Sequence, residues 1–455
     1  MTEFAYPVLG GVPEHVHNLS RQLAARGHDV TVLTSRAPLG RRRLAREIDA
    51  RNLSEHGYRT VRVGLSMPLI SNGSIARVTV GPGVKPRVAR ALRGMDVVHA
   101  QGMAPPMICL WALRTSPAPV NVGTFHTYFE GGHWGYRHFF AYVRSTIART
   151  DRLIAVSEAC VSAMRPYFDR DFDIIPNGVD TDLYHPLSTG TPRPPEPPRI
   201  LFVGRFDPRN GLDTLLEAVR ILQDEGRDFT LQVVGDGPMR PFYHRKARSL
   251  GVWDRVQWLG LLDQERPRLY REATVFAAPC VLASFGVVLI EAMASGTPIV
   301  CADNVGFRQV IRDGAPGRFA ACGDPTELAA GIGELLDDPG RRADWAARGR
   351  EIALERYSWK GVSLRVEELY LEVLAAKDGR PETRPPVGLR YNLRRNPLEL
   401  IRNIPSALRA GFPAMAGSAT TRPAAGGGHR RRRAGDPDLG DEGLGQAPID
   451  AGDRA

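Results

Sequence analysis

Short apolar runs alternate with longer segments of helical periodicity from the start of the chain to about residue 375. The short runs, such as Val30–Leu33 and Ile200–Val203, are rich in β-branched and aliphatic residues. In the longer segments, such as Glu14–Arg26, apolar positions recur at the spacing of an amphipathic helix. Regular alternation of these two patterns is typical of repeated β-α units that build a parallel sheet. The sequence therefore predicts an α/β protein.

The predicted strands form two series, one in each half of the chain. The first series comprises Val30–Leu33, Thr60–Val63, Asp96–His99, Val120–Gly123, Leu153–Val156 and Asp173–Ile175. The second series comprises Ile200–Val203, Thr230–Val234, Val256–Leu259, Thr274–Ala277, Pro298–Cys301 and Gly317–Ala320. Helices are expected between most of these strands, so each half resembles its own doubly wound, Rossmann-like sheet. Because such sheets bind ligands at the carboxyl ends of their strands, we expect a site in a central cleft between the halves.

Changes in composition predict the domain boundaries. Residues 1–186 form the predicted N-terminal domain, and residues 199–376 form the predicted C-terminal domain. The region 187–198 combines five prolines with Ser, Thr and Gly, which indicates a linker. Residues 377–455 are rich in Pro, Gly, Ala and Arg without a sustained period, so we expect a mostly disordered, basic tail.

The start of the sequence is unusual for this kind of sheet. Only Met1–Val8 precede the turn at Leu9-Gly10-Gly11, where a full buried strand is normally found. We expect either that the sequence begins inside this first strand or that the sheet tolerates a shortened one. In both cases the N-terminal sheet lacks backbone partners at this position.

Composition and charge indicate where the protein acts and which kinds of molecule it binds. No run approaches the ~18 consecutive apolar residues of a membrane-spanning helix, and the N-terminus lacks a signal-peptide pattern, so a cytoplasmic location is expected. The five cysteines include no Cys-x-x-Cys pair, which favours buried free thiols over disulfides or a zinc site. The net charge of +10 suits partners that carry phosphate, such as nucleotides, anionic lipids or nucleic acid.

Glycine turns at the ends of predicted strands are the candidate phosphate sites. Gly10 and Gly11 lead directly into a helix, whose free N–H groups and positive dipole end attract phosphate. A purely structural turn is the alternative reading. The spacing does not match the G-x-G-x-x-G fingerprint of dinucleotide-binding proteins, which disfavours a hydride-transferring enzyme.

The second half contains three further candidates. Arg205 and Arg209 lie on a loop after the strand Ile200–Val203, where they can neutralise a diphosphate that gains charge as a bond to it breaks. Asp236 lies in a similar turn after the next strand. The segment Ser284-Phe285-Gly286-Val287 opens a helix that carries Glu291, which suits a phosphate contact and a carboxylate for ribose hydroxyls. A solvated loop and a helix-capping turn remain the alternatives.

Taken in order, the motifs resemble one known family. They are Gly10-Gly11-Val12, Gly123-Thr124-Phe125-His126-Thr127, Pro176-Asn177-Gly178-Val179-Asp180, Val203-Gly204-Arg205, Gly235-Asp236-Gly237-Pro238 and Phe285-Gly286 through Glu291 to Pro298. Each motif alone is weak, but the ordered set is specific. Over residues 1–375 the chain resembles the GT-B, retaining glycosyltransferases of family 4 (glycosyltransferase group 1), and within them the phosphatidylinositol mannosyltransferase-like members.

The resemblance implies an activity and a set of roles. It implies a hexosyltransferase, with mannosyl favoured, that uses a GDP- or UDP-linked sugar and a lipid, small-molecule or glycan acceptor with retention of configuration. It implies no metal and no cofactor besides the donor, an acceptor-side N-terminal domain and a nucleotide-sugar-binding C-terminal domain. The implied catalytic residues are His126, near the sugar, and Arg205, on the diphosphate. The implied donor contacts are Gly10, Gly11, Arg205, Arg209, Asp236, Ser284, Phe285, Gly286, Val287 and Glu291.

Two positions depart from the family pattern. Asn210 stands where a lysine is usual, so Arg209 would have to supply the missing charge, and Ala283 replaces the first of two glutamates. We expect altered donor contacts rather than lost catalysis. Asp-x-Asp spacings at 169–173 and 180–182 flank an N-terminal strand and are interpreted as a solvated acidic edge rather than a metal site.

Other functions stay open at this point. The departures motivate a catalytically weak nucleotide- or glycan-binding partner protein, and the fold also occurs in sugar-nucleotide epimerases. The segment Arg390–Arg409 interleaves arginines with apolar residues and could contact an anionic membrane at the inner face. Specific nucleic-acid binding through Arg430–Arg433 is disfavoured, because adjacent arginines in a tail attract any polyanion.

Overall fold

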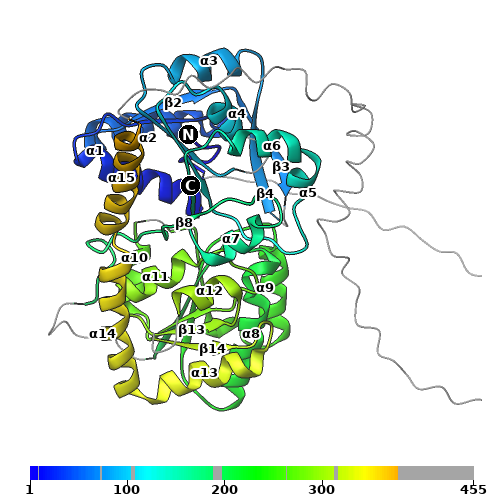
Figure 1. Cartoon of the computed structure of the whole chain (residues 1–455). Helices are drawn as coiled ribbons and strands as arrows, with labels where there is room; N and C mark the ends of the chain where they lie inside the picture. Colours follow the sequence, from blue (N-terminus) through cyan, green and yellow to red (C-terminus); the bar gives the residue numbers. More distant parts are fainter. Residues whose placement is uncertain are drawn as a thin grey trace, which may run out of the picture. The chain divides into compact units, whose positions relative to one another are not determined.

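The computed structural model of this chain consists of parallel β-sheets flanked by helices, with one antiparallel hairpin (Figure 1). The structure describes residues 1–8, 10–71, 74–103, 108–187, 197–262, 264–311 and 316–377. The predicted tail therefore lies outside the described residues, apart from its first residue. Most of the predicted linker is also outside them, so the domain boundaries stay a prediction.

The second half forms one six-stranded parallel sheet with the order β11-β10-β9-β12-β13-β14. Its strands are β9 (Arg199–Val203), β10 (Thr230–Val234), β11 (Val256–Gly260), β12 (Val275–Ala278), β13 (Ile299–Ala302) and β14 (Gly317–Ala320). The chain winds outward from β9 to one edge and then returns to β12, on the other side of β9. The strand order therefore reverses between β9 and β12, where such sheets bind ligands.

The strands of the first half form separate ladders. The parallel sheet β5-β6-β7-β8 consists of β5 (Val97–Gln101), β6 (Val120–Phe125), β7 (Arg152–Ala155) and β8 (Asp173–Ile174). The strands β1 (Thr31–Ser35) and β2 (Arg59–Val63) form a second parallel pair. Among the described residues, Met1 and Thr2 connect β1 with β5: the N–H of Thr2 donates to the carbonyl oxygen of Leu33, and Thr2 forms a parallel bridge with Gln101.

An antiparallel hairpin was not predicted from the sequence. It consists of β3 (Leu65–Ser71) and β4 (Ser74–Val80). Pro68 lies inside the first of these strands, and a proline within an apolar run argues against a strand because it cannot donate a ladder hydrogen bond. Here the other residues of β3 pair with β4, so the strand forms although Pro68 cannot donate a hydrogen bond.

Helices connect the strands in both halves. The first half contains α1 (Gly11–Ala25), α2 (Arg42–His56), α3 (Val84–Ala91), α4 (Ile108–Thr115), α5 (Trp134–His138), α6 (Phe140–Ile147), α7 (Glu158–Met164) and the 3₁₀ turn η1 (Leu39–Arg41). The second half contains α8 (Leu212–Asp224), α9 (Arg240–Ser249), α10 (Arg266–Glu272), α11 (Val287–Ala294), α12 (Val305–Val310), α13 (Pro325–Asp337), α14 (Pro339–Arg356), α15 (Trp359–Ala376), η2 (Pro208–Asn210) and η3 (Trp253–Arg255).

Apolar periodicity explains how the last helix packs. On α15, Trp359, Val362 and Val366 are buried, and they cluster with Val120 and Val122 of the first-half sheet. Figure 1 shows α15 beside α1, in agreement with the contacts between these two helices. The final helix of the described chain thus packs against the first half, although it follows the second-half sheet in sequence.

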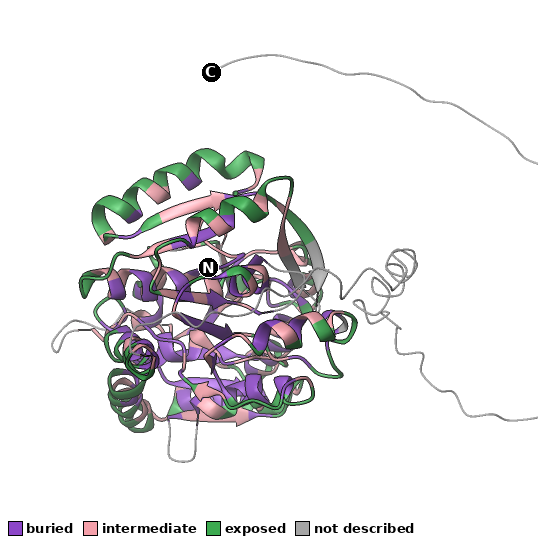
Figure 2. Ribbon diagram, turned by 45° about the horizontal axis from the view of Figure 1, so that its top comes forward, coloured by how far each residue is buried: buried purple, intermediate pink, exposed green. Residues whose placement is uncertain are grey.

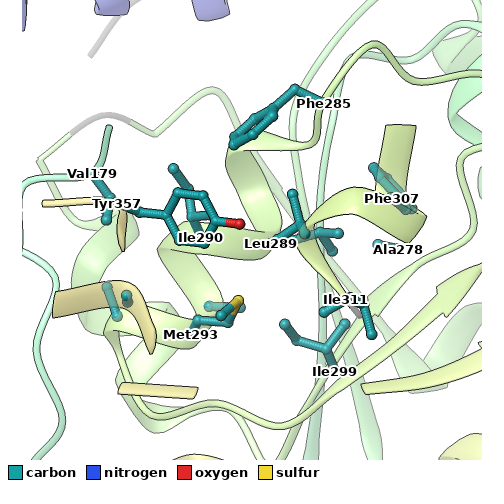
Figure 3. Packing of buried hydrophobic residues seen from close by; sticks show 14 of the residues in the cluster. Val179, Ala278, Phe285, Leu289, Ile290, Met293, Ile299, Phe307, Ile311 and Tyr357 are labelled. Atoms are coloured by element: carbon teal, nitrogen blue, oxygen red, sulfur yellow. The ribbon is translucent and has the colours of Figure 1, made fainter. Parts of the chain in front are cut away.

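Helix α11 lies in the centre of the second-half core. Leu289, Ile290 and Met293 are buried and point among side chains of β13, α12 and the loop before α15 (Figure 3). In Figure 2 the buried residues follow the strands and the inner faces of the helices, while the outer faces are exposed. Because α11 is buried from Leu289 to Ala294, the helix has a fixed position relative to the sheet, while Val287 and Val288 at its start are half-buried.

The fold class predicted from the sequence is confirmed. Each of the predicted strands has a counterpart whose ends differ by at most two residues. All five cysteines are free, as predicted, but Cys322 is exposed rather than buried, because it lies in the turn after β14 instead of within a strand. The predicted burial of that one thiol is wrong.

The loops after β9 and β12 approach so closely that a glycine is required. Gly211 has φ 66°, and a Cβ atom there would lie 2.2 Å from the carbonyl oxygen of Pro279.

Gly226 has a similar φ of 75°, with nothing within 4 Å of its Cβ position. Gly226→Ala should therefore lower the free energy of unfolding by about 1 kcal/mol, from backbone strain alone. Gly211→Ala should lower it by roughly 3 kcal/mol or more, because a steric overlap is added. Equal losses in chemical denaturation would contradict this account.

Candidate functional site

Loops from three neighbouring strands converge at the point where the second-half sheet reverses its order. The backbone N–H of Val281, after β12, donates to the carbonyl oxygen of Arg209, after β9, at 2.9 Å. The side-chain amide of Asn304, after β13, donates to the carbonyl oxygen of Cys280 at 2.7 Å. These bonds hold the predicted diphosphate loop next to the segment that opens α11.

Arg205 and Arg209 share one carboxylate. Arg205 donates through Nε and a terminal nitrogen to Oδ2 of Asp207, at 3.0 and 2.7 Å, and its side chain remains 48% exposed. Arg209 lies 3.8 Å from the same oxygen. The Asn210 amide donates to the carbonyl oxygen of Arg205 at 2.6 Å. Asn210 thus fastens the loop rather than carrying charge, which leaves two guanidinium groups against one carboxylate.

The first turn of α11 contacts the other half of the chain. Gly286, its N-cap, has φ 105°, and a Cβ atom there would meet the Phe307 ring. Ser284 accepts from the backbone N–H of Tyr128 at 2.8 Å, and its carbonyl oxygen accepts from the hydroxyl of Ser157 at 2.6 Å. The Phe285 ring is buried in the core (Figure 3), so only its backbone is available to a ligand.

Glu291 lies one turn further along α11 and is only 2% exposed. Its carboxylate accepts hydrogen bonds from the hydroxyls of Tyr270, at 2.8 Å, and Tyr184, at 3.3 Å. A guanidinium nitrogen of Arg266 lies 3.4 Å from the carboxylate and 2.5 Å from that of Glu14. Arg266, whose side chain is 18% exposed, therefore joins α10, α11 and α1 through one half-buried charge.

Burial controls the protonation of this cluster. Burial raises the pKa of Glu291, and Glu14 adds to the rise, while Arg266 opposes it. Burial alone would lower the pKa of Arg266, but Glu291, Glu14 and the two tyrosines together outweigh burial and raise it. Arg266 is therefore charged throughout the physiological range, and Glu291 depends on it to stay ionised.

The first half contributes the start of α1 and a group of neutral histidines. Nδ1 of His15 lies 2.9 Å from the amide oxygen of Asn177, and Nε2 of His126 lies 2.6 Å from the amide oxygen of Gln101. The two imidazole rings meet edge to face at 4.7 Å. Burial lowers the pKa of His15 to about 4 and that of His126 well below its usual range. His126 is therefore a neutral imidazole at the end of β6.

A cavity of about 380 Å³ brings some of the predicted residues together. Gly11, Val287 and Glu291 line it, with Glu14, His15 and Arg266 beside them. A Cβ atom on Gly11 would lie 3.8 Å from a methyl group of Val287, so the two glycine turns face each other directly. Two sequence motifs that are far apart in the chain thus form one site.

The remaining predicted residues lie outside the lining of this cavity. Arg205, Arg209 and His126 are not among its lining residues. Asp236 caps its own turn by accepting from the N–H of Gly237 at 2.8 Å, and it lies 3.2 Å from Arg240. The roles of these residues stay predictions.

Three carboxylates of the acidic edge of the first half form ion pairs. Asp173 pairs with Arg152, Asp180 with Arg21 at 2.7 Å, and Asp182 with Lys360 at 2.9 Å. In the part of the chain that the structure describes, His, Cys, Asp and Glu do not gather into groups of three that could hold a metal ion. Within that same part, no helix is both long enough and apolar enough to cross a membrane.

Comparison with known proteins decides the family. The model for glycosyl transferases group 1 matches residues 188–352, and the model for glycosyltransferase family 4 matches residues 9–183. A phosphatidyl-myo-inositol mannosyltransferase of Mycobacterium leprae is 33% identical over 374 residues, which cover 81% of this chain and 94% of that protein. This chain belongs to the family 4, group 1 glycosyltransferases.

Solved structures support the same fold. A glycosyltransferase from Rickettsia africae superposes with a TM-score of 0.66 at 19% identity and covers 82% of this chain and 97% of its own. Anabaena HepE in complex with UDP and glucose superposes with a TM-score of 0.63 at 20% identity, over 81% of this chain and 98% of its own. The GT-B fold and the enzyme class expected from the motifs, glycosyltransferase, are confirmed.

The site of this glycosyltransferase includes residues that the sequence did not reveal. Glu14 and His15 lie three and four residues after Gly11, so their position near the start of α1 was a usable signal. Arg266, Tyr184 and Tyr270 belong to no motif, and only folding brings them to Glu291. Nothing in the local sequence of Arg266, at the start of α10, marks it as part of a site.

The cluster around Glu291 makes the stability of the glycosyltransferase depend on Arg266. Because the pKa of Glu291 is raised in the folded state, its burial is tolerated at low pH and becomes costly as pH rises through that folded-state value. Removing the guanidinium raises this pKa further. Arg266→Met should therefore cost roughly 3 kcal/mol of folding stability at pH 8.5 and clearly less at pH 5.5.

Two controls separate this effect from loss of packing. The double variant Arg266→Met with Glu291→Gln should recover most of the stability at pH 8.5, because the buried charge is gone. Arg268→Met, on the same helix but exposed, should change stability by less than about 1 kcal/mol at either pH. Urea denaturation at both pH values measures all of these variants. A penalty for Arg266→Met that is the same at both pH values would show that the charge is not its cause.

Proposed function

We propose that this glycosyltransferase moves a mannosyl group from a nucleotide sugar to a phosphatidylinositol-type lipid acceptor, with retention of configuration. The observation that carries the proposal is the cavity in which Gly11 of one half faces Val287 and Glu291 of the other. Such a site presents two glycine turns and two helix N-termini to one ligand, which suits a phosphate group. The sugar and the acceptor are carried over from the mannosyltransferase relatives.

The donor diphosphate would lie between the α11 turn and the β9 loop. The first backbone N–H groups of an α-helix have no acceptor within the helix, so those at the start of α11 can bind phosphate oxygens. Nε of Arg209 and Oδ1 of Asp207 are buried without a hydrogen-bond partner among the described residues, so this loop has unused polar capacity. Negative charge grows on the diphosphate as the glycosidic bond breaks, and fixed positive groups stabilise that change most.

Glu291 would hold the ribose only in part. Its carboxylate already accepts from Tyr270 and Tyr184, so ribose hydroxyls would share an acceptor that is already fixed in place. A prepositioned carboxylate adds selectivity for a ribose without paying for its own ordering. The nucleotide base stays open between GDP and UDP, although UDP occupies the related Anabaena structure.

A lipid acceptor would require a membrane surface near the site. We propose that the protein binds peripherally to the inner face of the membrane. The segment Arg390–Arg409, which the sequence suggested for this contact, lies outside the described residues. A glycan or small-molecule acceptor is the alternative within the same reaction class.

A transfer assay tests the proposal directly. The protein is screened against GDP- and UDP-sugars for thermal stabilisation, since a bound donor raises apparent stability by mass action. The stabilising donors are then incubated with phosphatidylinositol vesicles or with a soluble glycan. Transfer of mannose from GDP-mannose to the lipid supports the proposal. A bound nucleotide without transfer to any acceptor favours a binding protein, and turnover of the donor without an acceptor favours an epimerase.

Arg205→Ala should remove most transfer activity and leave the fold intact. The residue is half exposed, so its partner in catalysis would be the diphosphate rather than the core. Losing this charge should cost about 3 kcal/mol of transition-state stabilisation, or roughly a hundredfold in kcat/KM. Arg220→Ala, which removes an exposed ion pair on α8, should leave kcat/KM unchanged. Wild-type kcat and donor affinity in Arg205→Ala would refute the diphosphate assignment.

Ala283→Glu should change donor preference more than it raises the rate with the native donor. Position 283 is half-buried in the loop that leads into α11, beside the proposed sugar site. A carboxylate there would accept hydrogen bonds from sugar hydroxyls that the wild type holds by other means. Relative kcat/KM over a panel of nucleotide sugars measures the effect, with Ala283→Gln as an uncharged control. An unchanged ranking of donors would show that position 283 does not contact the sugar.

A further inference from the structure

Another hollow of the surface lies within the first half, next to the segment that opens α11. Its volume is about 550 Å³, and its lining residues fall between Tyr128 and Tyr167. They come from the loop after β6, from α5 and from the end of α7, so we refer to this space as the α7 hollow. Its volume lies in the range of sites that bind small molecules.

The α7 hollow begins beside the proposed transfer site. The backbone N–H of Tyr128, which lines the hollow, donates to the hydroxyl oxygen of Ser284 at 2.8 Å. His126, predicted to lie near the transferred sugar, is two residues earlier on the same loop. On the other side, α7 is capped by Ser157, whose hydroxyl donates to the carbonyl oxygen of Ser284 at 2.6 Å. Both sides of the hollow are thus fastened to one residue of the second half.

The loop on one side of the hollow has a shape that favours glycine. Gly131 and Gly132 have φ values of 70° and 87°. A Cβ atom on Gly132 would lie 2.9 Å from the hydroxyl oxygen of Tyr167 and 3.6 Å from a guanidinium nitrogen of Arg137. The same hydroxyl oxygen accepts from the backbone N–H of His133 at 2.8 Å. Glycine at position 132 therefore keeps the space beside Arg137 open and leaves its own backbone within reach of a ligand.

Aromatic rings give the hollow an apolar surface. Phe129 and Tyr167 line it, and Tyr136 packs between them, with ring centroids at 5.9 Å from Phe129 and 5.1 Å from Tyr167. Phe129 and Tyr136 are buried, while Tyr167 is half-buried. The C–H faces of a sugar or cyclitol ring are apolar and can pack on such a surface, whereas the ring hydroxyls need hydrogen-bond partners.

The hollow offers such partners through one cation and one anion. In the part of the chain that the structure describes, no carboxylate forms an ion pair with the exposed guanidinium of Arg137. Glu130 accepts from the hydroxyl of Tyr128 at 3.4 Å, and burial and Glu130 raise the pKa of Tyr128, so that hydroxyl stays protonated. A guanidinium donates and a carboxylate accepts, so both needs of a ring hydroxyl are met. Because the two charges balance, a neutral ligand is favoured over an anion.

We infer that the α7 hollow binds the polyhydroxylated six-membered ring of the acceptor, with Arg137 donating to its hydroxyls and Glu130 accepting from them. Since it supplies the acceptor for the proposed transfer, this role rests on the proposed function. All lining residues belong to the first half, whereas the candidate diphosphate residues Arg205 and Arg209 belong to the second, so donor and acceptor meet beside Ser284. The ring is a cyclitol in a lipid headgroup or a hexose in a glycan, and the hollow suits the chemistry that both share.

Binding of the ring alone tests this role without relying on transfer. myo-Inositol and methyl α-mannoside are titrated into the full chain, with and without GDP or UDP, and followed by saturation-transfer NMR. At least one ring should bind, and Arg137→Ala should weaken that binding roughly tenfold, because a charge-assisted hydrogen bond is lost. Glu130→Gln should weaken it less, since an amide oxygen still accepts. Arg165→Ala and Glu158→Gln, which change exposed residues outside the lining of the hollow, should bind as the wild type does.

A steric variant tests the place of binding. Ser162 lies on α7, is exposed and lines the hollow, so the indole of Ser162→Trp would fill the hollow without entering the core. This variant should abolish ring binding and leave the thermal unfolding midpoint and its rise with a nucleotide sugar unchanged. Binding of myo-inositol alone would identify a lipid headgroup, and binding of the mannoside alone would identify a glycan; either result supports the ring site.

The transfer assay separates this site from the reaction. In an active enzyme, Arg137→Ala should raise the KM for the acceptor roughly tenfold and leave the KM for the donor near that of the wild type. Ring binding that Arg137→Ala and Ser162→Trp weaken, in a protein that transfers no sugar, would refute the proposed reaction and retain the ring site. A wild type that binds neither ring, or Ser162→Trp that binds a ring as well as the wild type does, would overturn the ring site.

Discussion

The half-buried guanidinium of Arg266 links the helices that line the candidate donor cavity. Its charge lies between Glu14 at the start of α1 and Glu291 on α11, and Tyr184 accepts a further hydrogen bond from it at 2.9 Å. A charge in this position is tolerable only while its partners remain. The start of α1, the first turn of α11 and the carboxylate between them therefore keep their arrangement together.

Glycine determines how closely the loops approach at the reversal of strand order. Gly211 and Gly235 each lie against a carbonyl oxygen of a neighbouring loop, where a Cβ atom has no room. The loops after β9, β10 and β12 can thus pack at the edge of the sheet and place Arg205 and Arg209 beside the opening of α11. The same glycine-containing loops therefore pack closely and carry the two positively charged side chains.

The described strands of the first half form three separate ladders rather than one sheet. These ladders are β1-β2, β3-β4 and β5-β6-β7-β8, and the backbone of Met1 and Thr2 bonds to both β1 and β5. The space between β1 and β5 is lined by strand residues and by the charged side chains of Asp29 and Glu367, whereas the starts of α1 and α11 line the candidate donor cavity.

The sequence by itself determined the fold class, the strands, the glycine turns and the family, because these depend on local periodicity and on motifs in order along the chain. It could not supply the hairpin β3-β4, where Pro68 obscured the pattern and only pairing with a partner strand makes the segment extended. Nor could it show that Glu291 is buried against Arg266, 25 residues earlier, or that Arg266 reaches Glu14 across 252 residues. Such contacts depend on how the helices pack in three dimensions, and the sequence around each residue carries no trace of its distant partner.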